Sequence, residues 1–334
     1  MKISVIVPVR NEEKSIGPLL DALLSQSQPP DEIVITDGGS TDATAAIIQN
    51  YINRGAPVCL IRTTKALPGR GRNLAAARAS NSWLAFTDAG IKPSAKWLEA
   101  LAVRARADPT VDVVYGSYEP TVDTFFKQCA AISYVSPPAE VEGSFIRSQS
   151  IASTLMRRMA WEQVGGFPEH LRSAEDLLFM QQIEQANFHI AYAPQAVVQW
   201  DLQPNMWRTF KRFTIYSRNN IRAGLWKQWQ KPILGRYLVL TLLGLPGLLL
   251  GKWWCAIPFA MWLLLLLTRA VVAIWRNRRV YPASILRNLA RLLIIAPLIA
   301  VLDLGLIVGT LKWFLADKLR FGRETATVGH GHGT

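Results

Sequence analysis

Cysteines are few in this chain, and they lie far apart. The 334 residues include three of them, Cys59, Cys129 and Cys255, and no two form a CxxC pair. That spacing excludes a zinc-finger ligand set and a disulfide framework, and it fits a reducing compartment. The chain opens with Met1 and Lys2 followed by an apolar run too short for the core of a signal peptide. We therefore expect the N-terminal part to stay in the cytoplasm.

Acidic residues are scarce in the C-terminal third. From Lys231 onward the chain has 13 Lys and Arg but 3 Asp and Glu, whereas the first 230 residues have 24 basic and 21 acidic ones. The net charge of +13 thus belongs mainly to an apolar part of the sequence. Basic residues that flank apolar segments are typical of a cytoplasmic membrane face, whereas nucleic-acid binding usually needs a basic face on a soluble domain. This distribution predicts a membrane partner and no nucleic acid.

Two common phosphate-binding signatures are also missing. Residues 68–73, Pro-Gly-Arg-Gly-Arg-Asn, lack both the Gly-Lys-Ser/Thr of a P-loop and the third glycine of a dinucleotide fingerprint. The two guanidinium groups of Arg70 and Arg72 still suit forked contacts with phosphate. Two arginines alone more often form surface contacts, so their value depends on the neighbouring motifs.

The first 200 residues do contain an alternation of short apolar strands and helices. Strands are predicted at 3–7, 31–36, 58–61 and 83–86, with helical segments between them, which predicts an α/β domain with a mostly parallel, doubly wound sheet. Three of these strands run into polar loops, at 8–13, 37–42 and 87–90. In open α/β sheets such strand ends form the ligand-binding edge. Asp88 could hold a hard divalent cation there, although an ordinary turn after a strand would explain the same residues.

The middle of the chain is less regular. Pro137, Pro138 and Gly143 favour a long irregular loop over residues 119–150. Residues 206–229 interleave aromatic and basic side chains, which is typical of an interfacial helix, or of a surface helix that packs on the sheet.

Three apolar segments follow, at 237–251, 253–275 and 292–311. The second and third are long enough to cross a bilayer, and Asp303 in the third should then face protein or water. Arginines between these two segments place that link in the cytoplasm, so the first two segments would form a hairpin. Basic residues after the third segment favour a cytoplasmic tail, which leaves open whether that segment crosses, re-enters or lies in the interface. The His-containing tract at 329–333 is a weak chelating sequence.

Several motifs of the N-terminal part occur in one order, and the ordered set is more specific than any member. They are Val-Ile-Val-Pro-Val-Arg-Asn-Glu-Glu at 5–13, Asp-Gly-Gly-Ser-Thr-Asp at 37–42, Arg-Asn at 72–73, Asp-Ala-Gly at 88–90, Gly-Gly-Phe at 165–167 and Glu-Asp at 175–176. This order resembles family-2 glycosyltransferases of the GT-A fold, over roughly residues 3–222. The resemblance implies a GT-A-like catalytic domain, which we place at 1–230. The aromatic and basic pattern predicts an interfacial helix region at 206–230, and the apolar segments predict a membrane domain of two to three apolar helices and a basic tail at 231–334.

The resemblance also implies roles for individual residues. The nucleotide-sugar pocket would be lined by Pro8, Arg10, Glu12, Asp37, Gly39, Arg72 and Asp88. Asp37 would hold the base and Arg72 would approach the ribose or the diphosphate. Asp88 matches the first Asp of an Asp-x-Asp motif, which binds the Mg²⁺ or Mn²⁺ of a nucleotide-sugar complex. Asp176 matches the general base, and Glu175 is its neighbour.

Two departures from the family pattern concern the metal. Gly90 replaces the second Asp of Asp-x-Asp, and Gln199-Trp200 stand in the region where a later His often completes the site. The metal motif is therefore weakened. The chain resembles a subgroup with Thr-Asp-Ala-Gly at this position, as in residues 87–90.

The activity implied by this resemblance is inverting transfer of a sugar from a nucleoside-diphosphate sugar to a lipid or lipid-linked acceptor. We expect an enzyme of the cell envelope, in the inner membrane as a hairpin or multi-pass protein, with its catalytic domain in the cytoplasm. Two alternatives stay open at this point. One is a processive polysaccharide synthase, for which three apolar segments are few, and the other is an inert nucleotide-sugar-binding scaffold.

Overall fold

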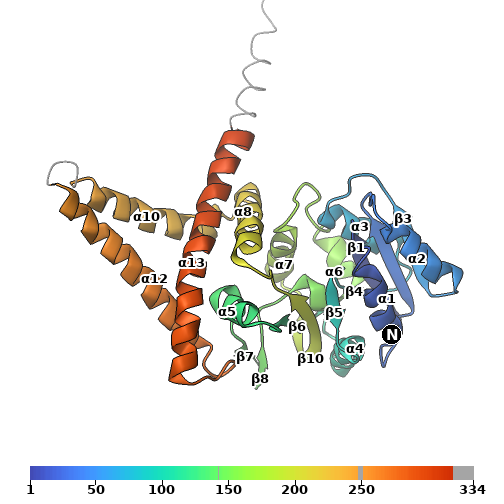
Figure 1. Ribbon diagram of the computed structural model, residues 1–334. Helices are drawn as coiled ribbons and strands as arrows, with labels where there is room; N and C mark the ends of the chain where they lie inside the picture. The colour runs from blue at the N-terminus through green and yellow to red at the C-terminus, as the bar shows by residue number, and fades with distance from the viewer. Residues whose placement is uncertain (142, 247–250, 319–334) are drawn as a thin grey trace, which may run out of the picture. The chain divides into compact units, whose positions relative to one another are not determined.

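The structure is a computed structural model of the chain, and it describes residues 1–141, 143–246 and 251–318. The chain divides into two compact units (Figure 1). The first consists of Met1–Thr121 and Pro138–Leu202, and the second of Val122–Pro137 and the chain from Gln203 onward. This division follows packing. The functional division that we predict at residue 230 stays a prediction.

The first unit is built on one eight-stranded sheet in the order β3-β2-β1-β4-β9-β6-β10-β5. β1 pairs in parallel with β2 and β4, β2 with β3, and β6 with β10, whereas β9 and β5 are antiparallel to their neighbours. The mostly parallel sheet is thus confirmed. Its strands are β1 Ile3–Val9, β2 Glu32–Asp37, β3 Val58–Arg62, β4 Trp83–Phe86, β5 Ile91–Pro93, β6 Val113–Thr121, β9 Thr154–Arg157 and β10 Ile190–Asp201.

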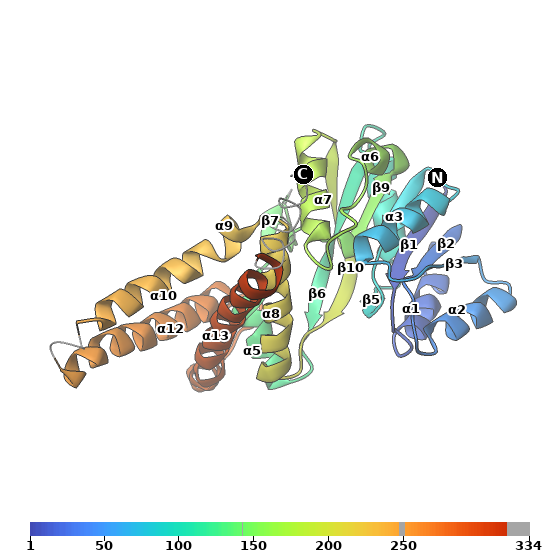
Figure 2. The same cartoon turned by 90° about the horizontal axis from the view of Figure 1, so that it is seen from above.

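Helices cover both faces of this sheet, because the central strands are apolar on both sides. Ile3, Val5 and Val7 of β1 belong to a core shared with α1, α2 and α4, and Ile6 belongs to a second core shared with α3, α6 and α7. Figure 2 shows α1 and α2 on the side of the sheet opposite α3 and α6. The helices are α1 Ile16–Leu24, α2 Thr44–Asn53, α3 Pro68–Arg78, α4 Trp97–Ala107, α6 Arg158–Gln163 and α7 Glu175–Gln185.

The register of the central strands brings their polar loops together. Val9 at the end of β1 pairs with Asp37 at the end of β2, and Ile6 pairs with Phe86 at the end of β4. Since the three strands are parallel and adjacent, the loops that follow them leave from the same edge of the sheet.

The expectation of a long irregular loop over 119–150 is wrong for most of that segment. β6 extends to Thr121, helix α5 occupies Phe125–Tyr134, and β7 (Ala139–Val141) pairs with β8 (Ser144–Ile146) as a two-stranded hairpin. The Thr124 hydroxyl caps α5 by accepting a hydrogen bond from the Lys127 amide at 3.1 Å. The apolar residues of α5 pack against helices more than a hundred residues later in the chain.

The second unit is helical. It contains α5, α8 Met206–Arg222, α9 Trp226–Trp229, α10 Lys231–Gly244, α12 Ala256–Arg276 and α13 Ile285–Trp313, with short helical turns at Lys252–Cys255 and Phe314–Lys318. Among the described residues, two helices are long and apolar enough to cross a membrane, at Ala256–Arg276 and Ile285–Asp317. Between these two helices, Asp303 of α13 is 1% exposed and forms an ion pair with Arg269 of α12 at 2.5 Å. The tract at 329–333 lies outside the described residues.

Candidate functional site

The loops after β1 and β2 are tied to each other by hydrogen bonds. Asp37 is 1% exposed, and its Oδ1 accepts a hydrogen bond from the Ser40 amide at 2.8 Å. The Asn11 amide donates to the Ser40 hydroxyl at 2.8 Å, and the Asn11 side-chain oxygen accepts from the Thr41 amide at 2.9 Å. Asn11 adopts a left-handed backbone, with φ of 56°. These contacts hold Asp37 in one position at the edge of the sheet.

Two glycines are required after Asp37 for physical reasons. A Cβ on Gly38 would lie 2.6 Å from the Ala66 carbonyl oxygen, and Gly39 has φ of +87°, which favours glycine. The loop can therefore approach the segment 63–66 closely. The predicted role of Gly39 in lining the pocket agrees with its place at this edge and stays a prediction.

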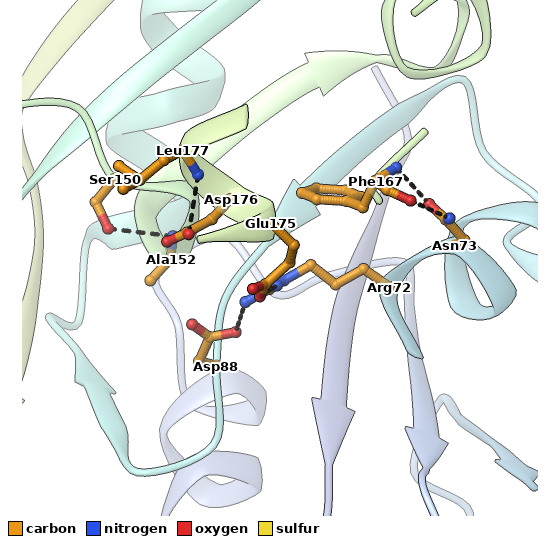
Figure 3. Close-up of polar contacts among 9 residues, drawn as sticks. All are labelled: Arg72, Asn73, Asp88, Ser150, Ala152, Phe167, Glu175, Asp176 and Leu177. Atoms are coloured by element: carbon orange, nitrogen blue, oxygen red, sulfur yellow. Dashed lines mark hydrogen bonds and ion pairs between the residues drawn. The ribbon is translucent and has the colours of Figure 1, made fainter. Parts of the chain in front are cut away.

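Arg72 lies at the centre of a cluster of charged side chains. It projects from α3, is only 4% exposed, and binds two carboxylates that are far apart in sequence. Its Nη2 donates to Asp88 Oδ1 at 2.6 Å and its Nη1 donates to Glu175 Oε1 at 2.8 Å (Figure 3). These carboxylates hold the guanidinium pKa above its usual value although burial opposes them. Arg72 thus stays protonated beside the end of β4, where the carboxylates of Asp88 and Glu175 balance its charge.

The ring of Phe167 and the amide of Asn73 position Arg72, and the sequence did not reveal this role. Phe167 stacks on Phe179 of α7 with ring centroids 3.8 Å apart, and the Arg72 guanidinium lies over the Phe167 ring at 5.4 Å. The Asn73 side chain donates to the Phe167 carbonyl at 2.9 Å and accepts from the Phe167 amide at 2.8 Å. The motifs at 72–73 and 165–167 are therefore two halves of one packing unit. The only sequence signal was their joint occurrence.

This packing unit is tight at the glycines. A Cβ on Gly69 would lie 2.2 Å from the Pro168 carbonyl oxygen, and a Cβ on Gly166 would lie 2.6 Å from the Asn73 side-chain oxygen. Gly166 also has φ of +75°. Any side chain at these positions would push α3 away from the loop before α7, so the glycines fix the distance between Arg72 and Glu175.

Glu175 and Asp176 form the first turn of α7. The chain enters this turn through Ala174, which precedes the helix. Ala174 has a left-handed φ of 69°, a strained conformation for a residue other than glycine. Burial raises the pKa of the Glu175 carboxyl, and Arg72 opposes that shift. Burial likewise raises the pKa of the Asp176 carboxyl, again with Arg72 opposing. A carboxylate with a raised pKa is a better proton acceptor than a solvated one, as a general base requires.

The cluster has unsatisfied polar atoms. Arg72 Nε and Glu175 Oε2 are buried and have no hydrogen-bond partner among the described residues. Buried polar groups are normally paired with protein, water or ligand. These two atoms mark the cluster as a place where a polar ligand or ordered water completes the bonding.

A divalent cation fits this site as part of a nucleotide complex. Asp88 is 32% exposed at its side chain, and its Oδ1 is held by Arg72. Among the described residues, no group of three or more His, Cys, Asp or Glu side chains could hold a metal ion. Mg²⁺ is commonly held by one or two carboxylates together with substrate phosphates. The single carboxylate of Asp88 meets that lesser requirement.

The other predicted residues lie at the end of β1 and on the loop that follows it. Pro8 packs closely on α3, since a Cβ on Gly71 would lie 3.0 Å from the Pro8 Cβ. The Glu12 carboxylate accepts a hydrogen bond from the Ser15 hydroxyl, and its Oε2 lies 4.0 Å from a Cβ built on Gly90. Arg10 is exposed on the loop after β1. The structure therefore brings Arg72, Asp88 and Glu175 into direct contact and places the remaining predicted residues along the same sheet edge.

Comparison with known proteins agrees with the motif order. Residues 4–162 match the family model described as Glycosyl transferase family 2. The chain is 29% identical over 201 residues to Glycosyltransferase AglE of Haloferax volcanii, which covers 58% of this chain and 65% of that protein. It is 28% identical over 210 residues to O-antigen chain rhamnosyltransferase RfbN of Salmonella typhimurium, covering 60% and 66%. The matches thus span just under two thirds of the length of these relatives.

One solved structure extends the similarity to most of the chain. The mannosyltransferase PcManGT of Pyrobaculum calidifontis, in complex with GDP-Man and Mn²⁺, is similar with a TM-score of 0.56 at 19% identity, and covers 95% of this chain and 88% of that one. At that identity the likeness speaks for the fold. The fold is GT-A-like, followed by C-terminal apolar helices. The family model thus matches just under half of the chain, and over that N-terminal part the chain is similar to family-2 glycosyltransferases.

Proposed function

We propose that the chain is an inverting glycosyltransferase that moves a sugar from a nucleoside-diphosphate sugar to a hydroxyl of a lipid or lipid-linked acceptor. The observation that carries this proposal is the Arg72 cluster. A buried guanidinium joins a carboxylate at the end of β4 to the first turn of α7, with Asp176 as the next residue. The residue that would recognise the phosphates and the residue that would act as the base thus belong to one packing unit.

The donor would occupy the edge formed by the loops after β1, β2 and β4. Asp37 would hold the nucleotide base, and Pro8, Arg10, Glu12 and Gly39 would line the pocket. Arg72 would approach the ribose or the diphosphate and supply positive charge there, and its Nε has no hydrogen-bond partner among the described residues. Asp88 would hold Mg²⁺ or Mn²⁺ with the diphosphate, and such an ion would stabilise the negative charge of the leaving group.

The acceptor would be activated from the α7 side. Asp176 would take the proton of the acceptor hydroxyl, whose oxygen forms the new bond to the anomeric carbon as the bond to the diphosphate oxygen breaks. The nucleoside diphosphate leaves with the bonding electrons, and the configuration at the anomeric carbon is inverted. Glu175 would act through Arg72, because its Oε1 is already bound to that guanidinium at 2.8 Å.

A membrane acceptor follows from the second unit. Two helices there are long and apolar enough to enter a bilayer, and the basic residues around them favour the cytoplasmic face of the inner membrane. An enzyme held in this way meets acceptors that stay in the membrane. One relative is named O-antigen chain rhamnosyltransferase, which is consistent with a role in the cell envelope.

The proposal is tested with membranes from cells that express the chain. They are incubated with UDP-, GDP- and dTDP-sugars, and extracted products are analysed by mass. We expect one donor class to add a single sugar to a lipid-soluble acceptor. Products of many lengths would indicate a processive synthase.

The matched control is Asp176→Asn, which keeps the shape of the side chain and removes the base. We expect the transfer rate to fall on the order of 10²-fold or more with donor binding nearly intact. If Asp176 only stabilises the helix start, thermal stability would fall and turnover per folded molecule would be preserved. Donor binding without transfer by the native chain, against every donor and membrane extract, would instead support an inert scaffold.

A further inference from the structure

Helix α13 and the turn that follows it have exposed leucines along one side. Their spacings of three, four, eleven, seven and four positions each return close to the same side at 3.6 residues per turn. We call this set the leucine stripe: Leu286, Leu289, Leu293, Leu304, Leu311 and Leu315. Basic residues border it near both ends, at Arg287 and Lys312. Composition alone makes this helix a candidate membrane span.

The face of α13 opposite the leucine stripe is covered by α8 over its C-terminal half. Cβ atoms on Gly305 and Gly309 would lie 3.2 Å from Phe213 and 2.5 Å from Ser217, so the two helices touch at their backbones. The Ser217 hydroxyl also donates to the Leu306 carbonyl at 2.7 Å. Figure 1 and Figure 2 both show α8 alongside α13.

The contact with α8 continues past the end of α13 through ion pairs. Arg218 and Arg222 each form two hydrogen bonds to the carboxylate of Asp317, at 2.6 to 3.1 Å. These bonds hold the Asp317 pKa well below its usual range. The end of α13 is therefore clamped to a basic helix.

The N-terminal half of α13 is covered on the same side by α5. Cys129 and Ile132 of α5 share a buried cluster with Ile295 and Ile299. The guanidinium of Arg291, 2% exposed, donates to the Gln128 side chain at 3.1 Å. Both ends of α13 thus lie against helices that are neither long nor apolar enough to cross a membrane themselves.

A crossing by α13 would force α8 into the hydrocarbon. The exposed side of α8 carries Arg208, Lys211 and Arg212, and ionised side chains facing lipid are costly. Helix α13 is also 29 residues long, or about 43 Å at 1.5 Å per residue, against a hydrocarbon core of about 30 Å. A helix that lies in the membrane surface avoids both difficulties: α8 stays out of the hydrocarbon, and the length of α13 need not match the thickness of the bilayer.

We propose that α13 does not cross the membrane but lies along its cytoplasmic surface, with the leucine stripe in the outer acyl region and α5 and α8 on the water side. The lipid partner is a bilayer with anionic headgroups, which complement the basic residues at both ends of the stripe, Arg287 and Lys312. Only the hairpin of α10 and α12 then enters the bilayer. The buried Asp303 fits this arrangement, because Arg269 of α12 and the Tyr237 hydroxyl of α10 both bind it and hold the base of the hairpin to α13.

This topology makes a direct prediction about sidedness. In a full chain with Cys59, Cys129 and Cys255 replaced, single cysteines are introduced as Arg279→Cys, between α12 and α13, and Thr334→Cys, at the end of the chain. Arg54→Cys, exposed on the first unit, is the reference for the cytoplasmic side. A membrane-impermeant maleimide is applied to sealed right-side-out and inverted vesicles. We expect all three cysteines to be labelled only in inverted vesicles, and labelling of positions 279 and 334 from opposite sides would overturn the proposal.

One further measurement keeps the proposal testable if the cysteine replacements disturb folding. Alkaline phosphatase fused after Thr334 of the unaltered chain should be inactive, and an active fusion would contradict the in-plane helix. Where the cysteine-replaced chain does fold, nitroxide labels at Leu289→Cys and Leu311→Cys should report equal depth by collision with oxygen and a nickel chelate. An upright helix would separate these positions by about 33 Å along the membrane normal. None of these readouts depends on sugar transfer, so their failure is distinct from a failure of the proposed function.

Discussion

Replacing Arg72 by methionine should destabilise the first unit strongly, and in a manner that depends on pH. The guanidinium is 4% exposed and is bound by Glu175, which is also 4% exposed. Methionine keeps the apolar contacts of the side chain but leaves that buried carboxylate without its cation. Asp88 is 32% exposed, so water replaces much of its lost partner.

The size of the effect follows from the fate of Glu175. Breaking a buried ion pair by removal of one partner costs about 3–5 kcal/mol. The carboxyl can instead take up a proton, which at pH 7 costs about 3.7 kcal/mol for an unperturbed pKa of about 4.3. The smaller cost limits the loss, so we expect the free energy of unfolding to fall by about 3–4 kcal/mol at pH 7. For a unit of this size that is roughly 10 °C in Tm.

The loss of stability in Arg72→Met should depend on pH, in a direction set by the pKa of Glu175. Burial already raises the Glu175 pKa and Arg72 opposes the shift, so removal of Arg72 raises this pKa further. An acid whose folded pKa lies above its unfolded value stabilises the fold below the unfolded pKa, and that contribution is lost as the pH rises through the folded pKa. The destabilisation of Arg72→Met should therefore shrink to about 1 kcal/mol near pH 5.

The assay is thermal unfolding of the purified full chain in detergent, at pH 5 and pH 7. Arg70→Met is the matched control, because Arg70 lies on the same helix, is 50% exposed at its side chain, and approaches Glu169 only to 4.0 Å. Adding Glu175→Gln to Arg72→Met should restore most of the lost stability, since no buried charge is then left. An equal loss at both pH values, or no rescue in the double variant, would refute the buried-pair reasoning.

Three other predictions concern the donor site, the base and the membrane. Asp88→Asn should lower turnover strongly and weaken metal-dependent binding of nucleoside diphosphate, and unchanged metal dependence in a titration would argue against Asp88 as a ligand. The transfer rate should fall as the pH drops through the raised pKa of Asp176, because the base must be ionised; a pH profile of kcat that keeps full rate down to the ordinary Asp range would contradict this assignment. The full chain should resist extraction from membranes by alkaline carbonate, because α12 is exposed and apolar along most of its length, and recovery in the soluble fraction would refute membrane insertion.

Local patterns in the sequence were sufficient for the α/β alternation and for the strand ends that carry Asp37 and Asp88. The strands and helices depend on residues that are close together in the sequence, as apolar runs of four to seven residues with helical segments between them. Parallel pairing of the strands then brings their ends to one edge of the sheet. The apolar helix α12 was equally visible, because length and composition decide whether a helix can enter a bilayer.

What only the tertiary structure decided depends on residues far apart in the chain. Arg72 meets Glu175 across 103 positions, and Asn73 meets Phe167 across 94, so no local period predicts either contact. Helix α5 was hidden in a segment rich in Pro and Gly, because its partners Ile295 and Ile299 are supplied by α13. Hydropathy made α13 a candidate span for the same reason that it identified α12, since it registers apolar residues and not what covers them. Helix α13 differs from α12 because the basic helix α8 packs on Gly305 and Gly309. That packing covers one face of α13 and decides which face stays exposed.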